Sequence, residues 1–527
     1  MNAIFDQYRH LFVPALASLP ALALVYAYAT SRTDTRKRKE LENFTRLPPG
    51  PPRLPFIGNL LNFPQARWYE TFSSWAKEHL GEEFDQVDKV PHGQRSHDNW
   101  DLMHLDILGS HLIVIHSLQA AKDLMEKRGA TYSDRPRDMM SYYVMGWNWN
   151  VVVAQPGSYH TNCRTIYKRS IGQTDVAQYE AVIVEEAQRM LEGFRSVQGD
   201  PWDVIEDVVG AVLNRVTYGD SIYKEHGKAM SDLNHEMLDL FTWASTQFWL
   251  VNFIPKLHSL PGWIPLSFKK IGKKGQELQR KMHYWPWQQT VDHFKRGIAE
   301  PSIALEYLDK DENLNTVRDA LGMMYSAGID NTASTFASFI SQMLLHPHIQ
   351  KKIQAEIDAE AGLGDTLPSF EQRPQFRYLD AAWRESMRLN PSAPLGISHV
   401  CSKEDVYEGY YIPKYTCLVS NIGFMGRDPR VFTNPDSYTP ERWLPEHNPD
   451  ASNLPDVYEF VFGFGRRICP GQFLADRIGF VFAAAVLKMY DILPLEGEEL
   501  PKEFLYQDAI TRRPEGVRCR FVPRKQD

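Results

Sequence analysis

Residues Phe462-Gly-Phe-Gly-Arg-Arg-Ile-Cys469-Pro-Gly471 place one cysteine among three glycines and two arginines. Glycines allow backbone N–H groups to approach a sulfur closely, and nearby positive charge favours the thiolate, the form that binds metal. A single cysteine is usually an inert core residue, but this surrounding pattern favours a ligand role. The other cysteines are scattered and form no CxxC pair, which argues against a disulfide framework or a zinc ribbon: Cys163, Cys401, Cys417 and Cys519.

The same string resembles the haem-binding loop of the cytochrome P-450 superfamily, FxxGxRxCxG, and matches it at every fixed position. The resemblance implies that the cofactor is haem b, iron protoporphyrin IX, with Cys469 as the proximal iron ligand. It also implies that Arg467 pairs with a haem propionate and that Phe462 packs beneath the ring. Thiolate ligation favours O–O cleavage and therefore oxidation of unactivated C–H bonds.

A second motif precedes this loop, because Glu385 and Arg388 are three residues apart and share a helix face. An exposed pair at that spacing is commonly only a solvated salt bridge. Pro440-Glu-Arg-Trp443 follows it as in the same family, and the resemblance then implies a buried structural triad of Glu385, Arg388 and Arg442. The role of such a triad is folding and haem retention.

The segment Ala327-Gly-Ile-Asp-Asn-Thr332 resembles the family's oxygen-activation motif, AGx(D/E)T(T/S), in which the glycine leaves room for dioxygen. The catalytic candidates are therefore Asp330, Asn331 and Thr332. Asn331 stands where the family places threonine, and an amide does not readily relay a proton. Either water carries the proton or Thr332 partly substitutes. Met324, Gly328, Asn331 and Thr335 lie on one stripe of the expected helix, and packing in the core is the alternative interpretation of that stripe.

Two further basic positions are candidates for the haem propionates. The family pattern WxxxR occurs here as His160 followed by Arg164, so the charged member persists while histidine replaces tryptophan. His399 occupies a position where the family often has a propionate-binding histidine or arginine. Either histidine could instead be a satisfied structural residue.

Helical patterns dominate the chain, and the clearest runs without proline from about Asn315 to Leu345 before His346-Pro347 ends it. Strand-like runs occur at 112–115 and 409–412. We therefore predict a mainly α fold with a minor β region, a cytochrome P-450-like fold with one N-terminal transmembrane helix. The polar segment from Glu82 to Asp101 is predicted to be a surface loop insertion.

The N-terminal part predicts a membrane anchor. Residues 11–30 carry no charge and are long enough to span a bilayer, and a basic cluster follows them. The expected organisation is a short lumenal segment (1–10), a transmembrane anchor (11–30), a basic and proline-rich linker (31–54) and a haem-thiolate catalytic domain (55–527). This predicts a single-pass protein of the endoplasmic reticulum membrane with a cytosolic catalytic domain, a cleaved secretory peptide being the alternative.

The function implied by the resemblance is insertion of one oxygen atom from O2 into a lipophilic small molecule, in the manner of fungal secondary-metabolism enzymes. NADPH would act indirectly through an NADPH–cytochrome reductase, because no dinucleotide or flavin motif is evident. A net charge of −8 gives no reason to expect nucleic acid binding. The alternatives are a haem-thiolate isomerase or dehydratase without a reductase, and a non-enzymatic haem carrier or sensor. The expected pocket walls are residues 142–149, 241–250, Met324, 394–397 and 509–511.

Overall fold

The computed structural model describes residues 46–84, 100–247, 249–261, 264, 266–310, 312–360 and 366–524. The predicted lumenal segment, the anchor at 11–30 and most of the linker lie outside these residues. No helix within the described ranges is long and apolar enough to cross a membrane.

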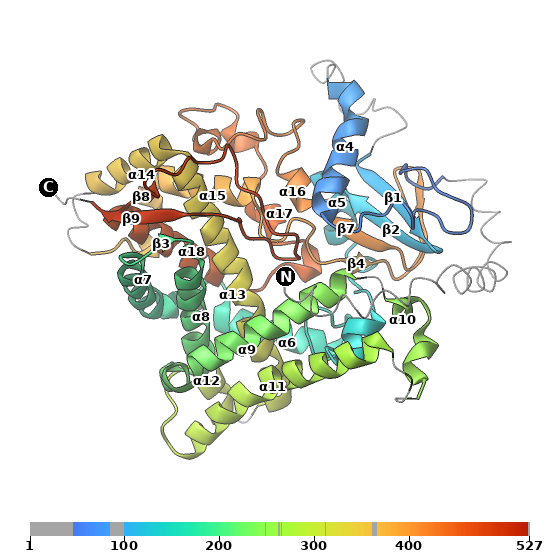
Figure 1. Ribbon diagram of the computed structural model, residues 1–527, viewed down its shortest axis with the longest axis horizontal. Coiled ribbons are helices and arrows are strands. Elements are labelled where there is room, and N and C mark those ends of the chain that lie inside the picture. The colour runs from blue at the N-terminus through green and yellow to red at the C-terminus, as the bar shows by residue number, and fades with distance from the viewer. Residues whose placement is uncertain are drawn as a thin grey trace.

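Most of the described chain is helical (Figure 1). The longer helices are α4 (Trp68–Phe84), α6 (Ser158–Ile171), α7 (Glu180–Phe194), α8 (Trp202–Tyr218), α9 (Asp220–Thr246), α11 (Ser267–Lys295), α12 (Ile303–Lys310), α13 (Leu314–Leu345), α14 (Pro347–Ala359), α15 (Arg377–Leu389) and α18 (Gln472–Met489). The short ones are α5 (Leu118–Ala121), α10 (Leu250–Phe253), α16 (Ile422–Met425) and α17 (Tyr458–Val461). Single π turns lie at Lys122–Lys127 and Met139–Val144. The 3-10 turns include Phe370–Gln375, Pro440–Trp443 and Gly465–Arg467.

The strands form three small sheets. In the first, the order is β1 (Leu102–Ile107), β2 (Ser110–Ile115), β7 (Cys417–Ser420) and β4 (His399–Val400), with β2 and β7 parallel. The second joins β3 (Gln198–Gly199), β9 (Cys519–Pro523) and β8 (Tyr490–Pro494), and the third joins β5 (Asp405–Tyr407) to β6 (Tyr410–Ile412). The prediction of a mainly α fold with a minor β region is confirmed.

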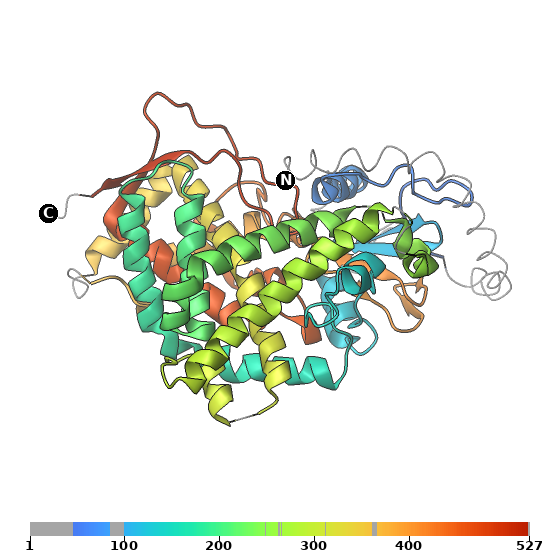
Figure 2. The ribbon, with the colours of Figure 1, turned by 60° about the horizontal axis from the view of Figure 1, so that its bottom comes forward.

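Helix α13 is the long helix expected from Asn315 to Leu345, and it begins one residue earlier, at Leu314. His346 ends it and Pro347 starts α14, because proline lacks the N–H that would continue the helix. It contacts α6, α8, α11, α15 and α18, and apolar residues such as Phe336 and Phe339 are fully buried in it. Figure 2 shows α9 and α11 lying side by side across the front of this central region. A helix that is apolar on most of its faces belongs in the interior.

The prediction that the segment from Glu82 to Asp101 is a surface loop insertion is wrong at both ends of the segment. Glu82 still belongs to α4, which continues to Phe84, and Trp100 and Asp101 are each 6% exposed. Asp101 is buried because its carboxylate pairs with Arg430 at 2.9 Å. The middle of the segment, residues 85–99, lies outside the described residues.

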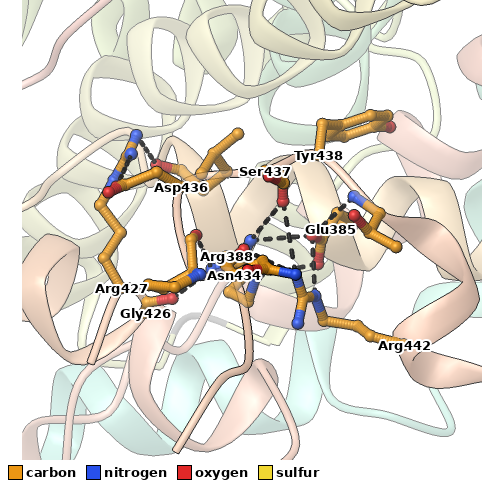
Figure 3. Close-up of polar contacts among 12 residues, drawn as sticks. Glu385, Arg388, Gly426, Arg427, Asn434, Asp436, Ser437, Tyr438 and Arg442 are labelled. Carbon is orange, nitrogen blue, oxygen red and sulfur yellow. Dashed lines mark hydrogen bonds and ion pairs between the residues drawn. The ribbon is translucent and has the colours of Figure 1, made fainter. Parts of the chain in front are cut away.

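A buried ion-pair cluster joins α15 to the turn before the cysteine loop (Figure 3). Glu385 accepts two hydrogen bonds from the Arg388 guanidinium, each at 2.8 Å, and one from Nε of Arg442 at 2.9 Å. Glu385 and Arg388 are fully buried and Arg442 is 7% exposed. The predicted structural triad is therefore confirmed, and it fixes the turn Pro440–Trp443 against α15.

Candidate active site

The cysteine loop is a tight turn between α17 and α18. Gly463 and Gly465 have φ angles of 80° and 51°, a left-handed conformation that glycine adopts most easily. A Cβ atom on Gly465 would overlap the carbonyl oxygen of Met125, so the close approach also requires glycine. The backbone N–H of Cys469 donates to the Phe462 carbonyl at 2.7 Å. This bond closes the loop and sets the sulfur just before the start of α18.

The sulfur of Cys469 is surrounded by groups that stabilise negative charge. Burial raises the pKa of its thiol, while the backbone N–H groups of Gly471 and Gln472 and the Arg164 guanidinium act in the opposite direction. Arg164 is held beside the loop, because its Nη1 donates to the Ile468 carbonyl at 2.5 Å. The positive end of the α18 dipole adds to these donors. A half-buried cysteine with such neighbours is suited to binding a metal as the thiolate.

The ring of Phe462 is held in place by a neighbouring aromatic residue. It stacks on the Tyr458 ring, with centroids 5.8 Å apart and planes 10° from parallel. The Tyr458 hydroxyl in turn donates to Asp476 at 2.5 Å and accepts from Arg373 at 2.7 Å. These contacts fix the orientation of Phe462 beside the cysteine.

Arg467 is a buried guanidinium that is only partly satisfied by protein. Its Nε donates to the Ser133 carbonyl at 2.9 Å and its Nη2 to the Ala154 carbonyl at 2.7 Å. Its Nη1 is buried and has no hydrogen-bond partner among the described residues. Burial, with a contribution from Arg164, lowers its pKa to about 10, and Asp134 opposes that shift. An unpaired donor of this kind is costly unless an acceptor binds there.

Arg135 is a second buried guanidinium in this region, and the sequence motifs did not mark it. Its Nε donates to the Val152 carbonyl at 3.0 Å, and its Nη1 donates to the carbonyls of Ile397 and Ser398 at 2.6 and 2.7 Å. Burial and the charge of Arg467 lower its pKa to about 9. Its partners are backbone carbonyls from two distant segments, and such carbonyls leave no signature in the sequence.

The two candidate histidines lie near the same arginines. Burial and then the neighbouring guanidiniums lower the pKa of His160 to about 4 and that of His399 to about 3. Nδ1 of His399 lies 2.7 Å from the Tyr132 carbonyl, which can only accept, so Nδ1 carries the hydrogen. Its Nε2 then carries no hydrogen and can accept a hydrogen bond from a protonated acid. A carboxylate bound there would instead raise the pKa of His399, so that Nε2 is protonated and donates.

These five groups form what we call the basic cluster: Arg135, His160, Arg164, His399 and Arg467. Burial lowers the pKa of all five groups, and the charge of neighbouring guanidiniums lowers it further for every member except Arg164. Within the described residues, Nη1 of Arg467 adds a donor without a partner. A ligand with two carboxylates would neutralise the cluster and satisfy that donor. Because the cluster adjoins a cysteine suited to metal binding, the residues fit a haem with its two propionates. The fold and site therefore define a haem-thiolate protein.

The catalytic candidates lie on α13 with different surroundings. Nδ2 of Asn331 donates to the Ala327 carbonyl at 3.0 Å, and its Oδ1 accepts from the hydroxyls of Ser392 and Thr511 at 3.2 and 3.4 Å. Thr332 is 5% exposed and packed in the core. Asn331 is therefore tied to two distant segments of the chain, which sequence reasoning did not foresee.

Asp330 is electrostatically coupled to several other charged residues. Burial and then the Glu206 carboxylate raise its pKa to about 7, Asp239 acts in the same direction, and His235 and Arg513 oppose it. His235 lies between two acids, with 3.4 Å from Nδ1 to Glu206 and 3.4 Å from Nε2 to Asp239. Glu206 of α8 and the residues His235 and Asp239 of α9 are all partly exposed to solvent. Asp330 is therefore electrostatically coupled to residues at the surface.

The packing around Gly328 differs from the expectation that this glycine leaves room for dioxygen. The position that its side chain would occupy is filled by Leu213 of α8, with 2.8 Å to Cδ1. The glycine therefore permits the close packing of α13 on α8, and it is not the source of an open space on that side.

The predicted pocket walls are partly brought together. Trp147 stacks on Trp149 with ring centroids 5.7 Å apart, and it contacts Phe241 of α9 at 4.6 Å. Trp149 also stacks on His283 of α11 at 3.9 Å, a partner that the sequence did not identify. Met324 is 9% exposed and Ile397 is 41% exposed. The segments 142–149 and 241–250 thus meet through aromatic side chains.

Comparisons with known proteins agree with this site. The family model Cytochrome P-450 matches residues 48–521. The cytochrome P-450 monooxygenase ple1 of Rhodocybe pseudopiperita is 29% identical, covering 98% of this chain and 95% of the relative. The tryptamine 4-monooxygenase of Psilocybe cyanescens is 30% identical, with 97% and 98% covered. The cytochrome P-450 monooxygenase claR of Ampulloclitocybe clavipes is 31% identical, with 91% and 86% covered.

The chain belongs to the cytochrome P-450 family, since the family model spans nearly all of it. Relatives of nearly full length are fungal monooxygenases, and the chain is a monooxygenase of this type.

Proposed function

We propose that the protein uses haem b, held by Cys469, to insert one oxygen atom from O2 into a lipophilic small molecule. The observation that carries this proposal is the basic cluster beside a half-buried cysteine, with a guanidinium donor at Arg467 that has no partner among the described residues. A thiolate-bound haem supplies the activation of O2 that such oxygen insertion requires. The chain supplies the ligand, the charge balance and the surrounding pocket.

The cofactor-binding residues in this proposal are those that surround the cysteine. Arg467 and Arg164 neutralise propionates, and His399 adds a third contact through Nε2 once a propionate raises its pKa. Phe462 packs beneath the ring, supported by its stacking on Tyr458. Arg135 adds positive potential to the same cluster.

We further propose that Asp330, Asn331 and Thr332 deliver protons at the distal side. Support for Asp330 comes from a pKa of about 7, which lets a carboxyl both gain and lose a proton near neutral pH. Its coupling to His235, Glu206 and Asp239 links it to groups that water can reach. Asn331 contributes hydrogen bonds, and Thr332 contributes a hydroxyl.

Electrons are proposed to come from NADPH through a membrane-bound NADPH–cytochrome reductase that docks on the Cys469 side. The apolar residues 11–30 and the basic residues after them support an anchor that brings the two proteins to one membrane. The proposed location is the endoplasmic reticulum membrane, single-pass, with the catalytic domain in the cytosol.

The proposed substrate is a lipophilic secondary metabolite or its precursor, of the terpenoid, polyketide or indole class. The aromatic contacts of Trp147 with Trp149 and Phe241 support a ligand with large apolar or aromatic surface. A relative named for tryptamine oxidation, 30% identical, supports including the indole class.

The test is coexpression of the full chain with NADPH–cytochrome reductase, followed by untargeted analysis of host metabolites. We expect a band near ~450 nm in the reduced carbon monoxide complex and a product that carries one oxygen atom from 18O2. Product that forms without NADPH would instead indicate an isomerase or dehydratase. Bound haem with no NADPH consumption and no product would indicate a carrier or sensor.

A further inference from the structure

The carboxamide of Asn331 is held by groups from three parts of the chain. One is the Ala327 carbonyl, one turn earlier on α13, at 3.0 Å from Nδ2. The others are the hydroxyls of Ser392, which follows α15, and Thr511, near the C-terminus, at 3.2 and 3.4 Å from Oδ1. All three side chains are half-buried. Two alcohols therefore meet at the one position where the helix lacks the family's threonine.

The Ala327 carbonyl determines which way the amide is turned. It can only accept a hydrogen bond, so it must face the NH2 group of Asn331, and the amide oxygen must face the two hydroxyls. Ser392 and Thr511 then donate to that oxygen and stabilise this orientation. The remaining N–H of Asn331 has no protein acceptor in the part of the chain that the structure describes. It is a donor available to a ligand or a water.

The two hydroxyls are themselves fixed by the backbone. The N–H of Arg512 donates to the carbonyl of Ser392 at 2.8 Å, so the segments that carry the two hydroxyls are joined next to the site. The Arg512 side chain donates to the Gln507 carbonyl at 2.9 Å and pairs with Glu70 of α4. A hydroxyl on an anchored segment holds its partner in one orientation more firmly than a mobile one would.

We propose that Ser392 and Thr511 are positioning residues for oxygenation, which hold the Asn331 carboxamide as a hydrogen-bond donor to the distal ligand and place two alcohols at position 331, where the family's threonine is missing. This inference rests on the proposed function of the site. Each hydroxyl keeps its hydrogen in the bond to the Asn331 oxygen, so neither alcohol is itself a proton source; they turn the remaining amide N–H toward a water, and that water carries the proton. Proton delivery then depends on Ser392 and Thr511 as well as on Asn331.

The test compares Ser392→Ala, Thr511→Val and the double variant in the full-length holoprotein. Carbon monoxide is the distal probe, and infrared spectroscopy of the reduced complex measures the C–O stretch. A donor near the carbon monoxide oxygen lowers that frequency, so we expect the variants to shift it upward. With reductase, NADPH and the substrate identified by coexpression, the ratio of peroxide to product should rise about two- to tenfold per lost hydrogen bond.

The controls separate positioning from simple damage. Ser392→Thr and Thr511→Ser keep a hydroxyl and should restore the wild-type frequency and ratio. Thr335→Val removes a hydroxyl that donates to the backbone carbonyl of Asn331 at 2.8 Å and leaves the carboxamide contacts intact, so it should change neither. If the double variant binds no haem, the single variants decide.

Two results would overturn the inference: an unchanged C–O stretch and peroxide ratio in both single variants, or an equal change in Thr335→Val. Either result leaves the proposed function standing, provided that the wild type shows its carbon monoxide band and its product. A wild type without that band would instead overturn the proposed function.

Discussion

Replacing Glu385 with glutamine should strongly destabilise the protein, because its carboxylate is the hub of the buried triad. Glu385 accepts two hydrogen bonds from Arg388 and one each from Arg442, the Thr439 N–H and the Trp443 indole N–H, at 2.8 to 3.0 Å. The glutamine side chain has nearly the same shape but no charge. Its NH2 group would also face guanidinium donors, which cannot accept a hydrogen bond.

The size of this destabilisation follows from the burial of the two guanidinium groups. Arg388 is fully buried and Arg442 is 7% exposed, so neither guanidinium can recover its hydration when Glu385 loses its charge. Breaking a buried ion pair in this way costs about 3–5 kcal/mol. The two pairs share one carboxylate, so their costs are not simply added. A loss of this size is a large fraction of the ~5–15 kcal/mol that holds a typical domain folded.

A matched control is Glu446→Gln, which removes the same charge from an exposed pair. Glu446 pairs with Arg377 at 2.9 Å, and their side chains are 45% and 55% exposed. Such a pair contributes about 0–1 kcal/mol. Urea unfolding, followed by tryptophan fluorescence, and haem content on purification should be measured for both variants. Equal losses in the two variants, or a loss below ~1 kcal/mol for Glu385→Gln, would refute the reasoning about burial.

Three further predictions concern the proposed function. Cys469→His should abolish the band near ~450 nm while the wild type keeps it, and survival of the band would contradict the ligand assignment. A chain that begins near Leu47 should move to the soluble fraction and keep its haem, and loss of haem on truncation would show that the removed residues do more than anchor. The pKa of Asp330 is raised from 3.8 to about 7, so this carboxyl is protonated below that pH in the folded protein. Product per NADPH should therefore fall as pH rises through about 7, and Asp330→Asn should remove this dependence; an identical pH profile in the variant would exclude Asp330 as the proton source.

The features that the sequence predicted correctly are those specified by neighbouring residues. Helix α13 follows from a long proline-free run that a proline ends, and its bounds agree within one residue at the N-terminal side. The triad was implied by the resemblance to the family, in which Glu385 and Arg388, one helical turn apart, meet Arg442 of a second short motif. The local pattern determines the helix, whereas the triad joins two separate segments and could be predicted only through the family motif.

The prediction for the segment from Glu82 to Asp101 failed because polarity alone does not determine exposure. Asp101 is a charged residue that reads as surface, yet its ion pair with Arg430 keeps it buried, and that partner lies 329 positions further along the chain. Arg135 was missed for a related reason, since backbone carbonyls satisfy it and carbonyls occur at every residue. Burial of a charge depends on partners that only the folded chain brings near.

Asn331 illustrates how far a motif can be followed. The sequence reveals that the family's alcohol is missing from α13, and the neighbouring Thr332 is the nearest replacement along the chain. Distance along the chain is a poor guide here, because residues one apart on a helix point about 100° away from each other. Thr332 is packed in the core, whereas the hydroxyls that reach the Asn331 carboxamide come from Ser392 and Thr511, 61 and 180 positions away. Thr511 was expected only as part of a pocket wall, and serine and threonine are too common for either position to stand out as a partner of Asn331 before the fold brings both to one atom.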